Sequence, residues 1–151
     1  MRKLQFVAAV IFSAFLLAGC GNAEVQPSAT PEPTPTPVSI QSRIAAFADA
    51  DVSEEDGQLI VGIRVEEADV EAACETFFSQ AENIYVSCIS GSEYTGVSFS
   101  LVHNGTVAGS IFVLPDEGGM KVYSPVVFNT DYETAFYTTF YASAFAKSLA
   151  D

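Results

Sequence analysis

The chain has 151 residues and a formal net charge of −13, from 19 acidic and 6 basic residues. A surface this acidic repels phosphate backbones and anionic headgroups, which argues against a nucleic-acid partner. The length allows one ordinary domain with a short accessory segment, but not two ordinary domains.

The first residues have the pattern of an export signal. Arg2 and Lys3 give a positive start, and residues 4–17 are apolar apart from Gln5 and Ser13. A helix of that length reaches about 21 Å, which is too short for a hydrocarbon core of about 30 Å. A charged start, a short apolar stretch and small residues at the exit predict a cleaved secretory signal over residues 1–19.

The apolar stretch ends in Leu17-Ala18-Gly19-Cys20, which resembles the lipobox of bacterial lipoproteins. The resemblance implies that the Cys20 thiol receives a diacylglyceryl group, that cleavage before Cys20 makes it the mature N-terminus, and that the protein stays on the extracytoplasmic face of a membrane. The alternative is an ordinary secreted protein with an incidental cysteine, because Ala18 and Gly19 also suit ordinary cleavage.

Residues 20–39 follow as a proline-rich segment, in which five of the seven prolines fall between positions 27 and 37. Such a composition cannot bury a core and favours extended polyproline conformations. At about 3.1 Å per residue it would reach roughly 60 Å. We interpret it as a tether between the lipid and a single domain at residues 40–151.

Within that domain, helical spacing predicts a short helix near residues 40–50, and alternation predicts a strand at residues 57–65. An acidic stretch at residues 66–71 then leads into a helix that ends near residue 82. A second alternating segment, residues 83–90, is predicted to be a strand, with Ile84, Val86 and Cys88 on one face.

Asn104-Gly105 is the favoured type I′ hairpin turn, so residues 95–114 are predicted to form two paired strands, with Phe99 opposite Ser110 and Leu101 opposite Ala108. Residues 120–128 add a strand that Pro125 confines to an edge. Thr130 and Glu133 form a capping box before about 17 helical residues. The order α-β-α-β-β-β-β-α predicts an α+β fold with an antiparallel sheet of four to five strands and helices packed on one face.

Cys74 and Cys88 remain if Cys20 is lipidated, and each lies on the predicted apolar face of its element. If that helix packs over that strand, a disulfide would close a loop of about 15 residues and contribute roughly 3 kcal/mol. The other interpretation, two inert buried thiols, is equally consistent with the sequence.

Residues 49–57 begin like a calcium-binding EF-hand loop, with Asp49, Asp51 and Ser53 at the first three ligand positions. Glu54 then replaces the required glycine and Ile60 the closing glutamate, so we expect a solvated acidic loop and no metal site. His103, the single histidine, is expected to be structural. The sequence indicates no cofactor and no catalytic set.

The last predicted helix carries more aromatic residues than one buried stripe accommodates. Tyr137 and Tyr141 fall on one row, which either completes a wide buried face or forms an exposed binding face.

The sequence therefore predicts, first, a lipid-anchored, non-enzymatic module that binds a ligand or protein outside the cytoplasm. The alternatives are a small cell-envelope hydrolase using paired carboxylates, and a structural subunit of a surface complex that pairs through an edge strand near residues 122–128.

Overall fold

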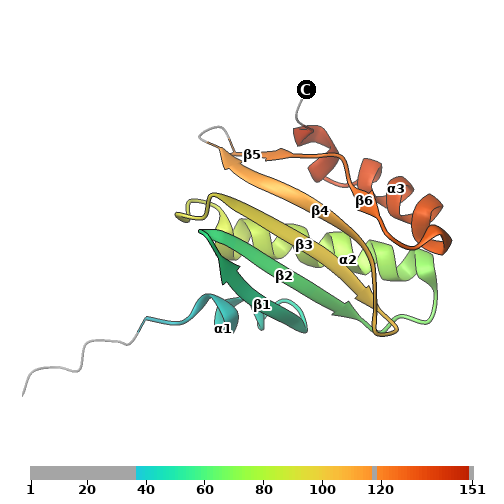
Figure 1. Cartoon of the computed structure of the whole chain (residues 1–151), viewed down its shortest axis with the longest axis horizontal. Coiled ribbons are helices and arrows are strands. Elements are labelled where there is room, and N and C mark those ends of the chain that lie inside the picture. Colours follow the sequence, from blue (N-terminus) through green and yellow to red (C-terminus); the bar gives the residue numbers. More distant parts are fainter. Residues whose placement is uncertain (1–36, 117–118, 150–151) are drawn as a thin grey trace, which may run out of the picture. The chain divides into compact units, whose positions relative to one another are not determined.

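The computed structural model describes residues 37–116 and 119–149. The predicted signal, Cys20 and most of the tether lie outside the described residues. Residues Thr36–Asp151 form one compact unit, and it has the predicted α+β architecture (Figure 1). None of the described helices is both long and apolar enough to cross a bilayer.

The sheet has six strands and is mixed, whereas the sequence predicted four or five antiparallel ones. The strands are β1 (Ala50–Glu55), β2 (Gln58–Val65), β3 (Gly96–His103), β4 (Thr106–Asp116), β5 (Gly119–Val122) and β6 (Val126–Val127). Their order is β1-β2-β3-β4-β5, and β6 also pairs with β4. Only β2 and β3 run parallel; every other pair is antiparallel.

A helical crossover explains the parallel pair. Helix α2 (Val70–Ile84) begins at the N-cap Asp69 and continues without interruption into a π-helical turn, η1 (Tyr85–Ile89). The predicted strand at residues 83–90 is therefore wrong. Ile84, Cys88 and Ile89 are buried while Val86 is exposed, which is a helical spacing. With a helix between them, β2 and β3 can lie parallel, because a parallel pair needs a crossover connection.

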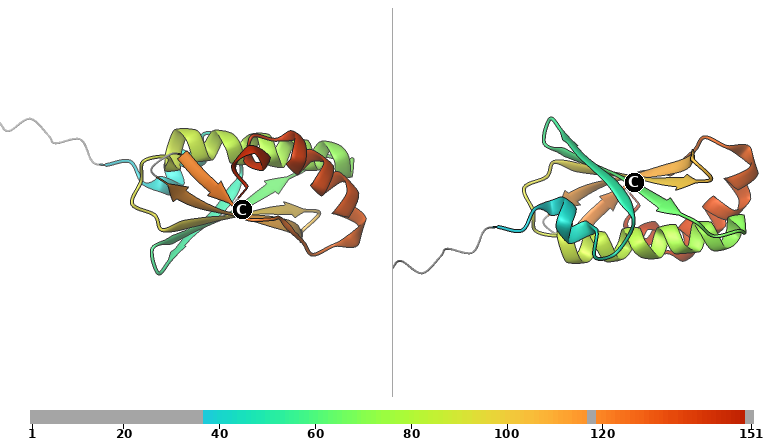
Figure 2. Two further views of the ribbon diagram at one scale, coloured as in Figure 1. Left: turned by 90° about the horizontal axis from the view of Figure 1, so that it is seen from above. Right: turned by 90° about the horizontal axis from the view of Figure 1, so that it is seen from below.

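The helices lie on one side of the sheet, as Figure 2 shows. They are α1 (Ile40–Ile44), α2 with η1, α3 (Glu133–Ala142) and the 3₁₀ turns η2 (Thr130–Tyr132) and η3 (Phe145–Ser148). The predicted final helix is real but interrupted. Ser143 turns extended, and the Ala144 N–H donates to Glu82 Oε1 at 2.8 Å. The predicted capping box is also corrected, because the side chain of Asn129, not Thr130, accepts from Asp131 N.

The core lies between the helices and the sheet. Alternate residues of β2 and β3, such as Val61, Leu59 and Phe99, are fully buried. Phe78 is at the centre of an aromatic cluster, with its ring centroid 4.9 Å from that of Phe77 and 5.0 Å from that of Phe136. The helix break at Ser143 lets Phe145 enter this cluster, where it is fully buried.

The Asn104-Gly105 turn joins β3 and β4 as predicted, and both residues have positive φ. Past Leu101 the register shifts at a β-bulge, so Phe99 pairs with Ile111 and Leu101 with Gly109 instead of the predicted partners. Gly109 is needed there, because a Cβ would lie 3.0 Å from the Phe136 ring.

Candidate functional site

One face of the sheet carries no helix among the described residues, and we call it the open face. It is turned toward the viewer in Figure 1, and both views of Figure 2 show the helices on the opposite side. The side chains that point to this face alternate with the buried ones along each strand. The positions on this face include Ile60, Gly62 and Arg64 of β2, Ser98, Ser100 and Val102 of β3, and Ser110, Phe112 and Leu114 of β4.

The open face becomes aromatic and apolar at the β5–β6 edge. We call Phe112, Tyr123, Val126 and Phe128 the edge patch. Tyr123, Val126 and Phe128 are among the most exposed large apolar residues of the described chain, and 61 % of Phe128 is accessible. The rings of Phe112 and Tyr123 lie 5.9 Å apart. Exposed apolar residues that lie along one sheet edge make this edge a candidate interaction surface.

Local backbone features hold the edge patch in place. Tyr123 N–H donates to Phe112 O at 3.0 Å, and Phe128 N–H donates to Ala108 O at 2.9 Å. Phe112 pairs with Ser98, and its ring reaches over the diagonal neighbour Gly96, at which a Cβ would come within 2.6 Å of Phe112 Cζ. The predicted edge strand is confirmed, although it is divided by a non-pairing segment that contains Pro125.

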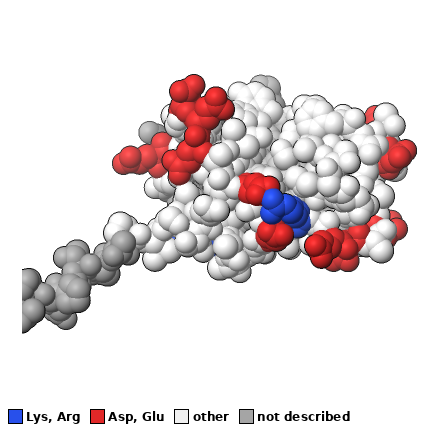
Figure 3. All heavy atoms as spheres, turned by 60° about the horizontal axis from the view of Figure 1, so that its bottom comes forward, with Lys and Arg blue, Asp and Glu red and all other residues white. Residues whose placement is uncertain are grey.

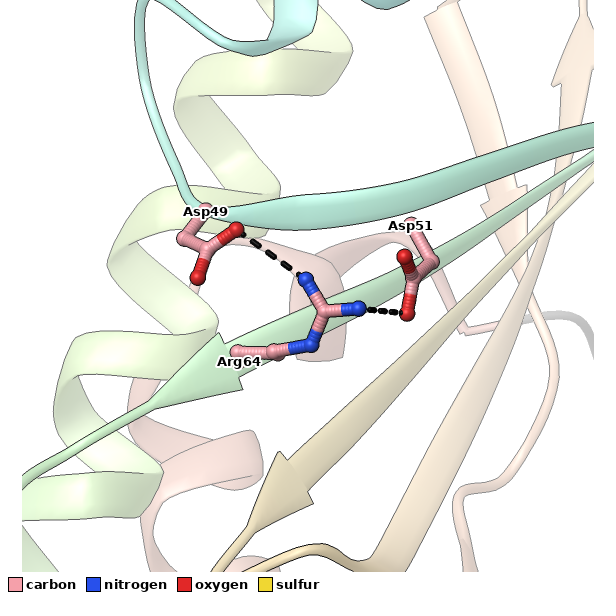
Figure 4. A network of polar contacts seen from close by, with 3 residues as sticks. All are labelled: Asp49, Asp51 and Arg64. Atoms are coloured by element: carbon pink, nitrogen blue, oxygen red, sulfur yellow. Dashed lines mark hydrogen bonds and ion pairs between the residues drawn. The ribbon is translucent and has the colours of Figure 1, made fainter.

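The opposite edge of the sheet is charged. The predicted acidic loop at residues 49–57 is in fact largely strand β1, which pairs with β2. Arg64 donates to Asp49 Oδ1 at 3.1 Å and to Asp51, as Figure 4 shows. The hydrogen bond and charge of Asp51, with a smaller effect of Asp49, raise the pKa of Arg64. The residues that resemble the start of a calcium loop thus bind an arginine.

Charge and apolar surface are separated on the molecule. Figure 3, in which the open face is seen obliquely, shows acidic side chains around a broad uncharged area, and near the middle of the view a basic side chain lies between two acidic ones. Charged residues on an edge strand discourage pairing with a second sheet. The β1 edge is therefore charged, whereas the edge patch is uncharged and aromatic.

Tyr137 and Tyr141 both lie on α3, in the helix layer. Tyr141 is 62 % exposed and packs edge-on against Phe140, while Tyr137 is half-buried. Phe136 and Phe140 occupy the buried side of the same helix. A binding role for the tyrosine row stays a prediction, and the row is separate from the sheet that carries the edge patch.

The two predicted disulfide partners are free, buried thiols. Cys74 and Cys88 belong to one continuous helical segment, so their 14-residue separation corresponds to about 20 Å along the helix axis. A disulfide needs Cα atoms within about 7 Å, so this fold does not permit the bond. Burial, with a contribution from Asp69, raises the pKa of Cys74 to about 11, and burial also raises that of Cys88. Neither thiol is activated as a nucleophile.

His103 is 1 % exposed and makes two hydrogen bonds. Its Nε2 lies 2.5 Å from the Glu67 carbonyl oxygen and its Nδ1 lies 2.6 Å from Tyr132 Oη. Because a carbonyl can only accept, Nε2 carries the proton and Nδ1 accepts from the tyrosine hydroxyl. Burial raises the pKa of Tyr132, which keeps that hydroxyl protonated as a donor. The histidine is structural, as the sequence indicated.

Comparisons with family models, curated proteins and solved structures found no match. The edge patch was only partly visible in the sequence: Pro125 indicated an edge, but exposure of Tyr123 and Phe128 depends on how the strand is divided. Within the described residues, the edge patch combines exposure and aromatic surface more clearly than any cluster that the sequence singled out.

Proposed function

We propose that this chain is a lipid-anchored, extracytoplasmic and non-enzymatic module that binds a protein partner at the edge patch and the adjoining open face. The observation that carries the proposal is the exposure of Tyr123, Val126 and Phe128 together at one edge of an otherwise acidic domain. Aromatic residues of this kind dominate the binding energy of protein interfaces.

The chemistry of the open face supports a protein partner. The serine and glycine residues on β2 to β4 have small side chains, and the Phe112 and Tyr123 rings lie beside them at the edge patch. Rigid aromatic side chains lose little conformational entropy on binding. Truncation of one such anchor costs about 2 kcal/mol in a typical interface, which is about 30-fold in affinity.

The N-terminal pattern supports the location. Two acyl chains at Cys20 would give stable anchoring, whereas a single chain holds only marginally. The proline-rich tether would then let the domain search for a partner at up to roughly 60 Å from the lipid surface.

The anchor is tested by metabolic labelling with an alkyne fatty acid. The full chain should incorporate the label and fractionate with membranes, whereas Cys20→Ser should lose the label and stay unprocessed. Equal labelling of both proteins, or a mature N-terminus other than residue 20, would contradict the anchor.

The surface is tested by affinity purification of the full chain after chemical cross-linking in cells. Tyr123→Ser with Phe128→Ser should reduce recovery of the cross-linked partner by about tenfold or more. Val86→Ser, which removes an equally exposed apolar side chain from η1, serves as the matched control and should not.

A third variant separates the two candidate surfaces. If Tyr141→Ser abolishes recovery while the edge-patch double variant has no effect, the partner binds the tyrosine row of α3 and the assignment to the edge patch is wrong.

A further inference from the structure

A hollow lies at the end of the sheet that is remote from the Asn104-Gly105 turn. It occupies about 600 Å³ between the segment that joins η1 to β3 and the end of β4. We call it the loop cleft; its lining includes Ser90, Ser92, Glu93, Tyr94, Asp116 and Gly119. A hollow of this size is typical of small-molecule sites.

The walls of the loop cleft are held in place on both sides. Thr95 donates to the Gly57 carbonyl through its N–H at 2.9 Å, and Tyr94 Oη donates to Glu54 at 2.8 Å. On the other side, Tyr85 Oη donates to the Gly119 carbonyl at 2.9 Å. The π-helical turn η1 feeds directly into this loop, and such turns are frequent at functional sites. The cleft is therefore formed before any ligand arrives.

Two groups in the cleft lack partners within the described structure. Ser92 Oγ is covered by protein and makes no hydrogen bond, and the Glu93 carboxylate has no described ion pair or hydrogen bond. A covered hydroxyl without a partner is costly, so native proteins contain few of them. Rotation of Ser92 about χ1 toward the cleft breaks no existing hydrogen bond.

The carboxylate of Asp116, a third polar group of the cleft, already accepts the ammonium group of Lys121. Lys121 Nζ lies 3.5 Å from Asp116 Oδ2, and both side chains are largely exposed. The cleft thus presents two carboxylates and hydroxyl oxygens around a half-buried tyrosine ring. Ca²⁺ needs about six to eight oxygen ligands, more than this set supplies, whereas an ammonium needs only two or three acceptors.

We propose that the loop cleft binds a primary ammonium group carried on a short aliphatic chain. Glu93 supplies the charge, Ser92 accepts one N–H, and the Tyr94 ring covers the aliphatic part. A neighbouring hollow on the other side of the loop is lined by Arg43, so the cation is placed on the Asp116 side. This site is independent of the edge patch.

Binding is measured by titrating butane-1,4-diamine into residues 20–151, expressed without the predicted signal and carrying Cys20→Ser, with two-dimensional NMR as the readout. The amide signals of residues 90–94 should shift and saturate. Glu93→Gln should weaken binding about fivefold or more, because it removes a charge-assisted hydrogen bond. Glu133→Gln, which removes the same charge from an exposed site on α3, should change affinity less than about twofold.

Two further variants sharpen the test. Ser92→Ala should weaken binding yet raise the melting temperature, because it removes a covered hydroxyl that has no partner. Lys121→Met should strengthen binding, since it removes the ammonium that competes for Asp116.

The source of the ammonium is distinguished with N-acetyl-lysine amide. Binding as tight as that of the diamine supports a lysine side chain, and weaker but saturable binding supports a free polyamine; both outcomes support the cleft. The proposal is overturned if Glu93→Gln and Glu133→Gln weaken binding equally, or if tetramethylammonium, which has no N–H donor, binds as well as the diamine. Either result would mean diffuse attraction to an acidic protein.

Discussion

His103 joins three segments that are far apart in the sequence. It lies at the end of β3, and its two ring nitrogens contact Tyr132 at the start of the C-terminal helices and the Glu67 carbonyl before α2. Burial of an imidazole is favourable only when both nitrogens have partners. The single histidine therefore fixes the path of the chain at one end of the sheet.

Replacing His103 by Phe should lower the free energy of unfolding by about 2–3 kcal/mol, because the Glu67 carbonyl and the Tyr132 hydroxyl both lose a partner. Tyr132→Phe removes one of the same hydrogen bonds and should cost only about 1 kcal/mol. Urea denaturation measures both. Equal stability of His103→Phe and the wild type would show that these contacts contribute nothing.

Cys74 makes stability depend on alkaline pH. Its pKa is raised from 9.0 to about 11 by burial and by Asp69. The thiol ionises first in the unfolded chain, so stability should be unaffected below pH 9 and should fall as the pH rises toward 11. The loss from this residue is roughly 2–3 kcal/mol.

Cys74→Ala removes this group and should show a smaller loss between pH 9 and 11 than the wild type, even though it is less stable at neutral pH. The measurement is a series of urea melts across that range. Parallel curves for the two proteins would show that the thiol ionises normally in the folded state.

At the scale of elements, two glycines have different roles in β3 and β4. A Cβ at Gly96 would meet the outer end of the Phe112 ring on the open face, where that ring can move. A Cβ at Gly109 would lie 3.0 Å from both the buried Phe136 ring and the Val126 carbonyl oxygen. Of these two positions, only Gly109 is enclosed on two sides.

Gly109→Ala should therefore destabilise the domain by about 2–3 kcal/mol, as overpacking does in a rigid core. Gly96→Ala should cost about 1 kcal/mol or less, and it should displace Phe112 from β3. Thermal unfolding gives the order, and Phe112 ring NMR signals report the displacement. Equal costs at the two sites would contradict this account of the packing.

Local pattern predicted most elements but not their boundaries. The alternation in β2 and the Asn104-Gly105 turn were sufficient to predict a strand and a hairpin, because each of these structures is decided by neighbouring residues. Residues 84–89 were misassigned because a short apolar run fits both a strand and a buried helix. Strand β1 was missed because acidic residues, which protect an exposed edge, also resemble a loop.

At the scale of the molecule, the misassigned residues 84–89 and the missed strand β1 explain why the sheet topology and its charged edge were not predicted. The helical continuation to Ile89 makes β2 and β3 parallel and rules out the disulfide between Cys74 and Cys88. Strand β1 adds the charged edge opposite the edge patch. Neither the open face nor the edge patch could be predicted from a single segment, because residues of several strands form each of them.

The two edges of the sheet also differ in charge and in apolar surface. Acidic β1 resists strand pairing, while the β5–β6 edge presents Tyr123, Val126 and Phe128. On the proposed function, the tether would let the domain turn this second edge toward a partner.

The most direct test of the account is site-specific photo-cross-linking of the full chain in cells, with a photoreactive residue at position 128 in one strain and at position 86 in another. Both positions are exposed, but only the first belongs to the edge patch. The account predicts one discrete cross-linked protein from position 128 that is absent from position 86 and is lost on adding Tyr123→Ser. The same adducts from both positions, or none from position 128, would contradict it.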